Sequence, residues 1–326
     1  MPTPEEKKPT SDRTKTRLFL VLKILVSGGL IWLLFSSVDT ADTLARLKTA
    51  TPGYLLLAVL VLLTQSFSNT LRWTSILKAV GKPLTFWNAY RVTYIGLFFN
   101  QTLPSAVGGD AFRIYLAHKS GTGLGKAANS VLIERVMTVL ALVILVALTQ
   151  PLLLARIEDT QAKWIFPLLA VTAIAGIGFL IFLERLPENL RHWKIIRAIA
   201  ALGSDTKTVF FKPGQAAQCF LWSLYGHLSL SFMAYLVGLS LDLHIGLIDC
   251  LVLIPPVILV MTIPISIAGW GVREGAMVVA LGMIGIARAD ALSLSIIFGL
   301  LTVMTALPGG LVWMFSGERK DRQRTF

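Results

Sequence analysis

Two stretches of this 326-residue chain decide its fold: "TLPSAVGGDAFR" at residues 102–113 and "IPISIAGWGVRE" at residues 263–274. Each lies in an apolar region, and each combines a proline, glycines, an arginine and a nearby acid. Proline removes a backbone hydrogen-bond donor, and glycine tolerates turns that other residues resist. Both stretches therefore predict that one helix ends and another begins inside an apolar segment.

The two stretches also predict an internal repeat. Pro104 and Pro264 are 160 positions apart, and so are Arg113 and Arg273. This offset is close to half the chain. It divides an expected transmembrane domain, residues 18–315, into halves of roughly 18–160 and 161–315.

The composition indicates a membrane protein. Hydrophobic residues make up 55% of the chain, charged residues 15%, and the mean hydropathy is +0.70. Soluble domains carry about 25% charged residues. The net charge of +12 suits anionic lipid headgroups. Nucleic acid is not an expected partner, because no polar stretch is long enough to fold as a nucleic-acid-binding domain. Cys219 and Cys250 show no disulfide or metal-site spacing, and no cofactor is expected.

The hydropathy pattern predicts an all-α polytopic membrane protein with about six full spans, since a span needs roughly 20 apolar residues. Two longer apolar regions, 84–117 and 247–287, are each expected to form a broken helical hairpin, either re-entrant or made of two short spans. A polar segment, 1–17, precedes the first span, and a basic tail, 316–326, follows the last. The expected full spans are 18–38, 53–71, 131–150, 164–183, 216–241 and 291–315.

Lysine and arginine mark the cytoplasmic side of membrane proteins. Both ends of the chain are basic, and Arg72, Lys78 and Lys82 are interpreted as a basic loop after the second span. The resulting topology has both termini in the cytoplasm. It brings the two hairpins in from opposite sides, which defines an inverted repeat of the kind found in transporters.

The broken helices predict an anion site. A helix that starts inside the membrane presents unpaired N–H groups and a positive dipole end. Arg113 and Arg273 are expected in the first turns of these helices, where a guanidinium suits phosphate. For Asp110 and Glu274, capping or pairing with the arginines and contact with substrate or protons are left as alternatives. The residues expected to break the helices are Pro104, Gly108, Gly109, Pro264, Gly269 and Gly271.

Other polar residues are weaker candidates for the same site. Glu134 and Arg135 either point into the cavity or form an ion pair at the membrane interface. Arg91 and Asn100 either line the route or satisfy the broken backbone nearby. His227 is expected to make a hydrogen bond between helices.

The motifs "NQTLPSAVGGDAFRIYLA" at 100–117, "ERV" at 134–136 and "PISIAGWGVREGA" at 264–276 resemble the flippase-like, lysylphosphatidylglycerol synthase transmembrane family. The resemblance implies movement of lipids between leaflets, with relatives linked to aminoacylated phosphatidylglycerol, hopanoids and polyprenyl-linked sugars. Fused members carry a catalytic domain that this sequence lacks, so lipid synthesis by this chain is not expected.

We therefore expect a lipid translocator, not an enzyme, in a bacterial inner (plasma) membrane. Its substrate would be an anionic or phosphate-bearing lipid, held by Arg113 and Arg273. With no nucleotide site in the sequence, movement would be passive or coupled to a gradient. Two alternatives stay open: a membrane-embedded enzyme using Asp110, Glu134 or Glu274 as acid or base, or a scaffold for a separate lipid-modifying enzyme. A homo-oligomer is compatible with the sequence.

Overall fold

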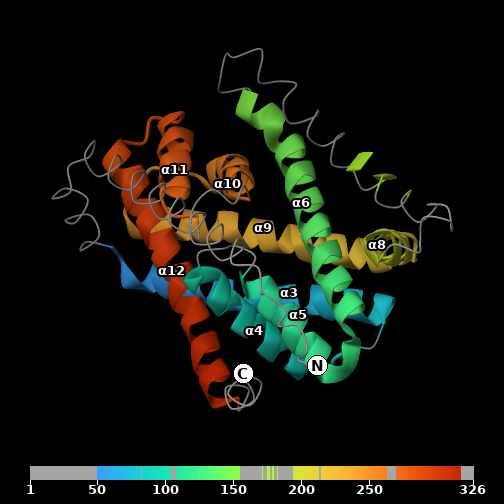
Figure 1. Ribbon diagram of the computed structural model, residues 1–326. Helices are drawn as coiled ribbons and strands as arrows, with labels where there is room; N and C mark the ends of the chain where they lie inside the picture. The colour runs from blue at the N-terminus through green and yellow to red at the C-terminus, as the bar shows by residue number, and fades with distance from the viewer. Residues whose placement is uncertain are drawn as a thin grey trace, which may run out of the picture.

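The computed structural model describes residues 50–81, 83–103, 108–154, 194–212, 214–262 and 269–316, with isolated positions between 171 and 182. The described residues form helices and connecting turns (Figure 1). The helices carry the labels of that figure: α3 Pro52–Val80, α4 Phe86–Thr102, α5 Gly108–Ala117, η1 His118–Thr122, α6 Leu124–Leu154, α8 Lys194–Phe211, α9 Gln215–Ser240, α10 Leu247–Met261, α11 Val272–Gly282 and α12 Arg288–Phe315.

Four of the described helices, α3, α6, α9 and α12, are long and apolar enough to cross a membrane. They coincide with four of the expected spans. Large apolar side chains such as Leu60, Leu148, Leu221 and Leu311 are exposed on them, as expected for surfaces that face lipid. The expected spans 18–38 and 164–183 lie outside the described residues, apart from isolated positions of the second.

Both broken regions consist of two short helices that pack on each other: α4 with α5, and α10 with α11. In the first pair, Phe99 stacks on Phe112 with ring centroids 3.7 Å apart, and the Asn100 side chain reaches the backbone of Gly109. These contacts make α4 and α5 an antiparallel hairpin. The expected breaking residues Pro104 and Pro264 lie outside the described residues.

The helices repeat at the offset seen in the sequence. Moved by 160 positions, α3, α4, α5 and α6 fall on α9, α10, α11 and α12, with boundaries that agree within a few residues. The packing repeats as well: α4 contacts α12 as α10 contacts α6, and α3 contacts α4 as α9 contacts α10. The two halves of the described fold are therefore structurally equivalent.

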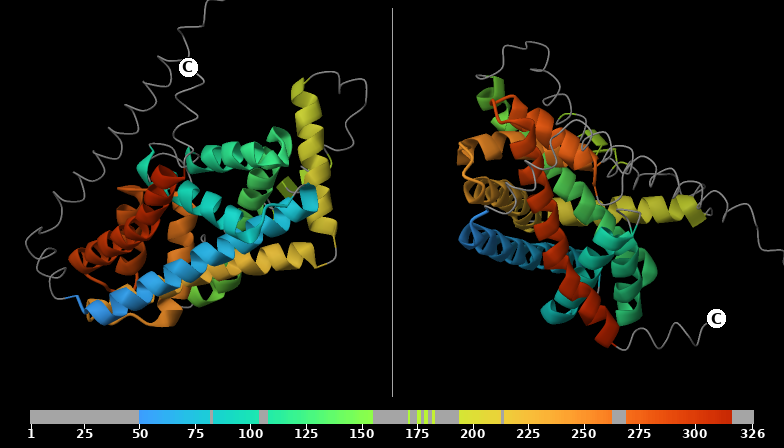
Figure 2. Two further views of the ribbon diagram at one scale, coloured as in Figure 1. Left: turned by 90° about the horizontal axis from the view of Figure 1, so that it is seen from below. Right: turned by 90° about the vertical axis from the view of Figure 1, so that its left-hand side faces the viewer.

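The equivalent helices α3 and α9 pack against each other over their lengths (Figure 2, left). The N–H of Thr51 donates to the Ser240 carbonyl at one end, and Ser75 donates to Gln218 at the other. These contacts make α3 and α9 antiparallel, which is the relation that an inverted repeat requires.

Two apolar clusters lie at opposite ends of the α3–α9 pair. One contains Leu62, Met233 and Met277 and joins α3 and α9 to α10, α11 and α12. The other contains Trp73, Ile95 and Leu116 and joins α3 to α4, α5 and α6. Polar side chains occupy the middle of α3 and α9 between the two clusters, and this polar region holds the candidate site.

Candidate functional site

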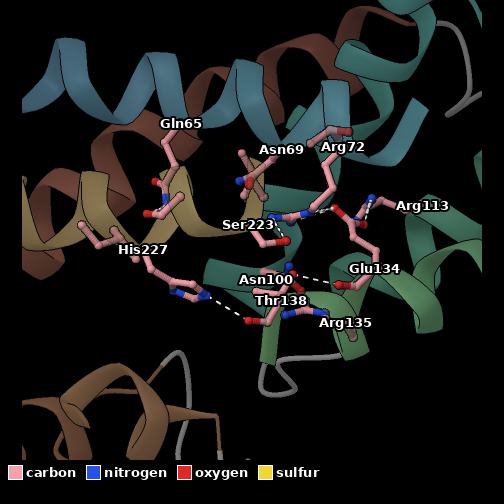
Figure 3. A pocket seen from close by; sticks show the side chains of 14 residues that line it. Gln65, Asn69, Arg72, Asn100, Arg113, Glu134, Arg135, Thr138, Ser223 and His227 are labelled. Atoms are coloured by element: carbon pink, nitrogen blue, oxygen red, sulfur yellow. Dashed lines mark hydrogen bonds and ion pairs between the residues drawn. The ribbon is translucent and has the colours of Figure 1, made fainter. Parts of the chain in front are cut away.

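A cavity of about 190 Å³ lies where α3, α4, α5, α6 and α9 meet. Figure 3 shows polar side chains from these helices pointing toward one another around it. Its residues are mostly charged or hydrogen-bonding. The lining includes Gln65, Asn69, Arg72, Thr93, Asn100, Arg113, Glu134, Arg135, Thr138, Ser223 and His227.

Glu134, on α6, binds two arginines from two other helices. One carboxylate oxygen accepts from Nε of Arg72 at 3.2 Å and from Nη2 at 2.8 Å, while the other accepts from Nη2 of Arg113. Arg72 also donates to the hydroxyl of Ser223 at 3.4 Å. The side chains of all three charged residues are less than 10% exposed. Glu134 thus joins α3, α5 and α6 through buried ion pairs.

Asp110 extends this chain of ion pairs. Its carboxylate accepts from Nε of Arg135 at 2.7 Å and lies 3.6 Å from Nη1 of Arg113. Arg135 is half exposed, so the chain runs from the buried interior toward the surface.

The charges of the residues in this series of ion pairs do not balance. Three arginines (Arg72, Arg113 and Arg135) face two carboxylates (Asp110 and Glu134), which leaves one positive charge in excess. The Nε–H of Arg113 is buried without a hydrogen-bond partner in the described part of the chain. The buried members, Arg72, Arg113, Asp110 and Glu134, balance, so the half-exposed Arg135 carries the surplus charge. Together with the unused donor of Arg113, this surplus indicates an anion site.

Two glycines let the α4–α5 hairpin bring Arg113 to the cavity. The side chain of Arg113 packs over Gly96, where a Cβ would overlap it. A Cβ on Gly109 would collide with the Gly96 carbonyl, so the two backbones touch. The N–H of Gly109 donates to Asn100 Oδ1 at 2.9 Å, and the Arg113 guanidinium lies 4.4 Å from the Trp73 ring centre. Gly109 serves close approach between the helices.

A second cavity, of about 230 Å³, adjoins the first. Arg273 lines it, and the two cavities share four residues from α3, α4 and α9: Gln65, Asn69, Leu97 and Leu230. Arg113 and Arg273, which were expected to hold one headgroup together, thus line separate but adjoining cavities.

The surroundings of Arg273 differ from those of Arg113. Glu274, its neighbour in the chain, accepts from Nε at 3.0 Å and from Nη2 at 2.5 Å. The other Glu274 oxygen accepts from the Gly271 N–H and caps α11. Trp270 lies under the guanidinium, 4.4 Å away. Glu274 therefore both caps the helix and neutralises Arg273.

The glycines before α11 form a turn, whereas those of the α4–α5 hairpin allow close contact between helices. Gly269 and Gly271 have φ of +80° and +84°, which L-residues with a side chain rarely adopt. The turn they form precedes Arg273, which lies in the first turn of α11. By contrast, Arg113 is the sixth residue of α5, so its expected place in the first turn is wrong. It lies one turn deeper, facing Glu134.

The first cavity is lined by four of the expected residues and the second by Arg273, whereas Asp110, Glu274 and Arg91 line neither; the four are Arg113, Glu134, Arg135 and Asn100. Of the alternatives for Glu134 and Arg135, both residues line the first cavity, and Glu134 is too buried to be an interfacial charge. Asn100 lines the cavity and also satisfies the hairpin backbone. The expected interhelical bond of His227 is confirmed by its contact with the Thr138 carbonyl at 3.0 Å.

Arg72 is the charged residue of the first cavity that was not expected there from the sequence. It was interpreted as a loop residue, but it lies inside α3 and is 6% exposed. A sequence signal existed: Gln65, Asn69 and Arg72 have helical spacing and fall on one face, while Trp73, Ile76 and Val80 continue the apolar pattern. In the described residues, no three histidine, cysteine, aspartate or glutamate side chains gather as a metal site would require.

The apolar helices, the inverted pair of halves and the buried charged cavity define a helical integral membrane protein. The model of the lysylphosphatidylglycerol synthase transmembrane region matches residues 20–309, so the chain belongs to that family. It is similar to a UPF0104 membrane protein of Methanocaldococcus jannaschii, with 29% identity over 38% of this chain and 36% of the relative. A UPF0104 membrane protein of Archaeoglobus fulgidus is 29% identical over 36% of each chain. The matched segments thus span about a third of these relatives.

Proposed function

We propose that the protein is a lipid translocator, not an enzyme, and that it moves an anionic or phosphate-bearing lipid between the leaflets of a plasma membrane. The observation that carries the proposal is the surplus positive charge of the ion pairs at the first cavity, which lies among helices with apolar outer surfaces. A phosphate supplies the missing negative charge, and a lipid supplies tails that stay in the bilayer.

The arginines of the first cavity would bind the phosphate. Arg72 and Arg113 converge on the two oxygens of Glu134 from different helices, so their guanidinium groups already surround one oxyanion. A phosphate presents similar oxygens and accepts paired hydrogen bonds from arginine. Binding would make use of the free Nε–H of Arg113.

The repeat supports a mechanism for movement. Antiparallel halves that share a central site can expose it alternately to the two sides by rocking against each other. Here α3 and α9 lie side by side in the centre, and both cavities lie against them. We propose that α3 and α9 form the axis of this motion and that the two hairpins move about it.

The test is a lipid translocation assay in reconstituted vesicles. Tail-labelled phosphatidylglycerol is placed in both leaflets, and a membrane-impermeant quencher reports movement to the outer leaflet. The wild-type protein should exceed protein-free vesicles, and Arg113→Gln should slow movement about tenfold or more, the scale set by loss of a charge-assisted bond. Lys78→Gln is the matched control, because Lys78 is an exposed cation of α3 that lines neither cavity.

Each variant is first shown to be folded by size-exclusion chromatography and by its unfolding temperature. A folded Arg113→Gln protein that moves phosphatidylglycerol at the wild-type rate would overturn the proposed site. Wild-type protein that moves no anionic lipid faster than empty vesicles would overturn the proposed function.

A further inference from the structure

The second cavity differs chemically from the first. Its polar lining is dominated by neutral groups: the amides of Gln65, Asn69 and Gln101, and the hydroxyls of Ser66, Thr302 and Thr305. Arg273 is the one charged residue among the described lining, and Glu274 neutralises it. A neutral polar cavity therefore adjoins a cationic one.

The hydroxyls of the second cavity are arranged to accept hydrogen bonds. Ser66 donates to the Leu62 carbonyl at 3.1 Å, Thr302 to Gly299 at 2.7 Å and Thr305 to Leu301 at 2.9 Å. Each hydroxyl has one proton, and these contacts use it. The lone pairs of the three oxygens are left for a ligand. This side of the second cavity therefore suits a ligand that donates hydrogen bonds, such as one with several O–H groups.

The shared residues join the two cavities into one binding region. Gln65 donates to the Gly226 carbonyl at 3.1 Å, which fixes its amide and leaves its oxygen as an acceptor. Gln65 and Asn69 are four positions apart on α3, one turn above the other, and both line both cavities. A ligand with its phosphate beside Arg72 and Arg113 would place the adjacent part of its headgroup beside these amides.

The charge of the region disfavours a cationic headgroup. Glu134 is the only carboxylate among the described residues that line the two cavities, and it already binds Arg72 and Arg113. Four arginines line the same space: Arg72, Arg113, Arg135 and Arg273. Among these lining residues, an ammonium group would meet four arginines and one carboxylate that two of them already bind.

We propose that the transported lipid carries an uncharged, hydroxyl-rich group next to its phosphate, and that the second cavity binds this group. The inference rests on the proposed function and names its substrate class: a phospholipid with a polyol or sugar headgroup. Lipids whose headgroups carry an ammonium group, including aminoacylated ones, are poor substrates.

The first experiment compares four tail-labelled lipids in the vesicle assay. Phosphatidylglycerol and phosphatidylinositol carry a phosphate with a polyol, phosphatidic acid carries the phosphate alone, and lysyl-phosphatidylglycerol adds ammonium groups. The two polyol lipids should move about tenfold faster than lysyl-phosphatidylglycerol, in line with the cost of an unpaired like charge. Lysyl-phosphatidylglycerol moving as fast as phosphatidylglycerol would overturn the inference.

The second experiment removes the neutral acceptors while keeping side-chain volume. The double variant Thr302→Val, Thr305→Val changes residues that line the second cavity alone. It should slow the polyol lipids to the rate of phosphatidic acid and leave phosphatidic acid unchanged. Thr208→Val on α8 is the matched control, because Thr208 is exposed and lines neither cavity. Equal slowing of all lipids by the double variant would contradict a headgroup subsite.

Native mass spectrometry separates this inference from the proposed function. Purified protein is incubated with an equimolar mixture of the four lipids, and the retained lipids are identified. Preferential retention of the polyol lipids by a protein that moves none of them would overturn translocation and leave the ligand class standing. Unselective retention, or preference for lysyl-phosphatidylglycerol, would overturn the inference itself.

Discussion

Arg72 and Glu134 are 62 positions apart in the chain, yet two nitrogens of Arg72 donate to the same oxygen of Glu134. This pair ties the middle of α3 to the start of the α6 span. Because both groups are buried, each compensates the charge of the other. The pair therefore contributes to folding as well as to the candidate site, and mutation can separate the two roles.

Arg72→Met should destabilise the protein by about 1.5–3 kcal/mol, the scale of hydrogen bonds to a charged group, because Glu134 loses Arg72 but keeps Arg113. The double variant Arg72→Met, Glu134→Gln should recover only part of this loss, since it leaves the buried Arg113 without the carboxylate of Glu134. Unfolding temperature in detergent measures the effect. Lipid movement should stay low in both proteins, whereas recovery of movement along with stability would show that the pair is only structural.

Gly109→Val should prevent the α4–α5 hairpin from closing, because its side chain would enter the space of the Gly96 carbonyl. Overpacking of this kind costs about 1–3 kcal/mol or more. The measured comparison is between Gly109→Ala and Gly125→Ala, because the β-branched side chain of valine would itself disfavour the helix at Gly125. Gly125→Ala meets nothing within 4 Å and should change stability by less than about 1 kcal/mol. Similar unfolding temperatures for Gly109→Ala and Gly125→Ala would contradict the close backbone contact.

Glu274→Gln and Glu274→Ala should separate the two tasks of Glu274. Glutamine can still accept from the Gly271 N–H but carries no charge to neutralise Arg273. Alanine loses both interactions, so it should cost about 1 kcal/mol more than glutamine, the usual value of a cap. Thermal unfolding compares them, and equal costs would mean that the cap contributes nothing.

Cysteines at Ser75 and Gln218 should be joined by a short thiol cross-linker, because the two side chains are 2.8 Å apart across α3 and α9. The background replaces the buried Cys219 and Cys250 with serine. Cysteines at Ser75 and Ser240 form the matched control, since these residues lie at opposite ends of the pair. Mobility in gel electrophoresis reports the link. Cross-linking of the control pair but not of the test pair would make α3 and α9 parallel.

Much of the fold was predictable because its signals are local. Apolar runs located the four described spans, and proline and glycine located both hairpins, since each feature depends on neighbouring residues only. The 160-residue repeat was also visible, because Arg113 and Arg273 lie at the same distance in sequence from Pro104 and Pro264. These signals need no knowledge of which helices touch.

The site was predictable only in part, because its ion pairs join distant segments. Arg72 was assigned to a loop since the span was ended at residue 71, and nothing near it in sequence reveals Glu134 as its partner. The different roles of the two repeat arginines were also hidden. Arg113 binds a carboxylate from another helix, whereas Arg273 binds the one beside it in the chain.

The charged cluster belongs to one half of an otherwise symmetric fold. At the positions equivalent to Arg72 and Glu134, the second half has Phe232 and Leu294. If both halves carried identical residues, the states open to either leaflet would have equal energy, and each would be occupied half of the time. With the cluster on one side only, the two states differ in energy and their populations are unequal. Under the proposed translocation mechanism, the empty protein should therefore rest with its cavity open mainly toward one leaflet.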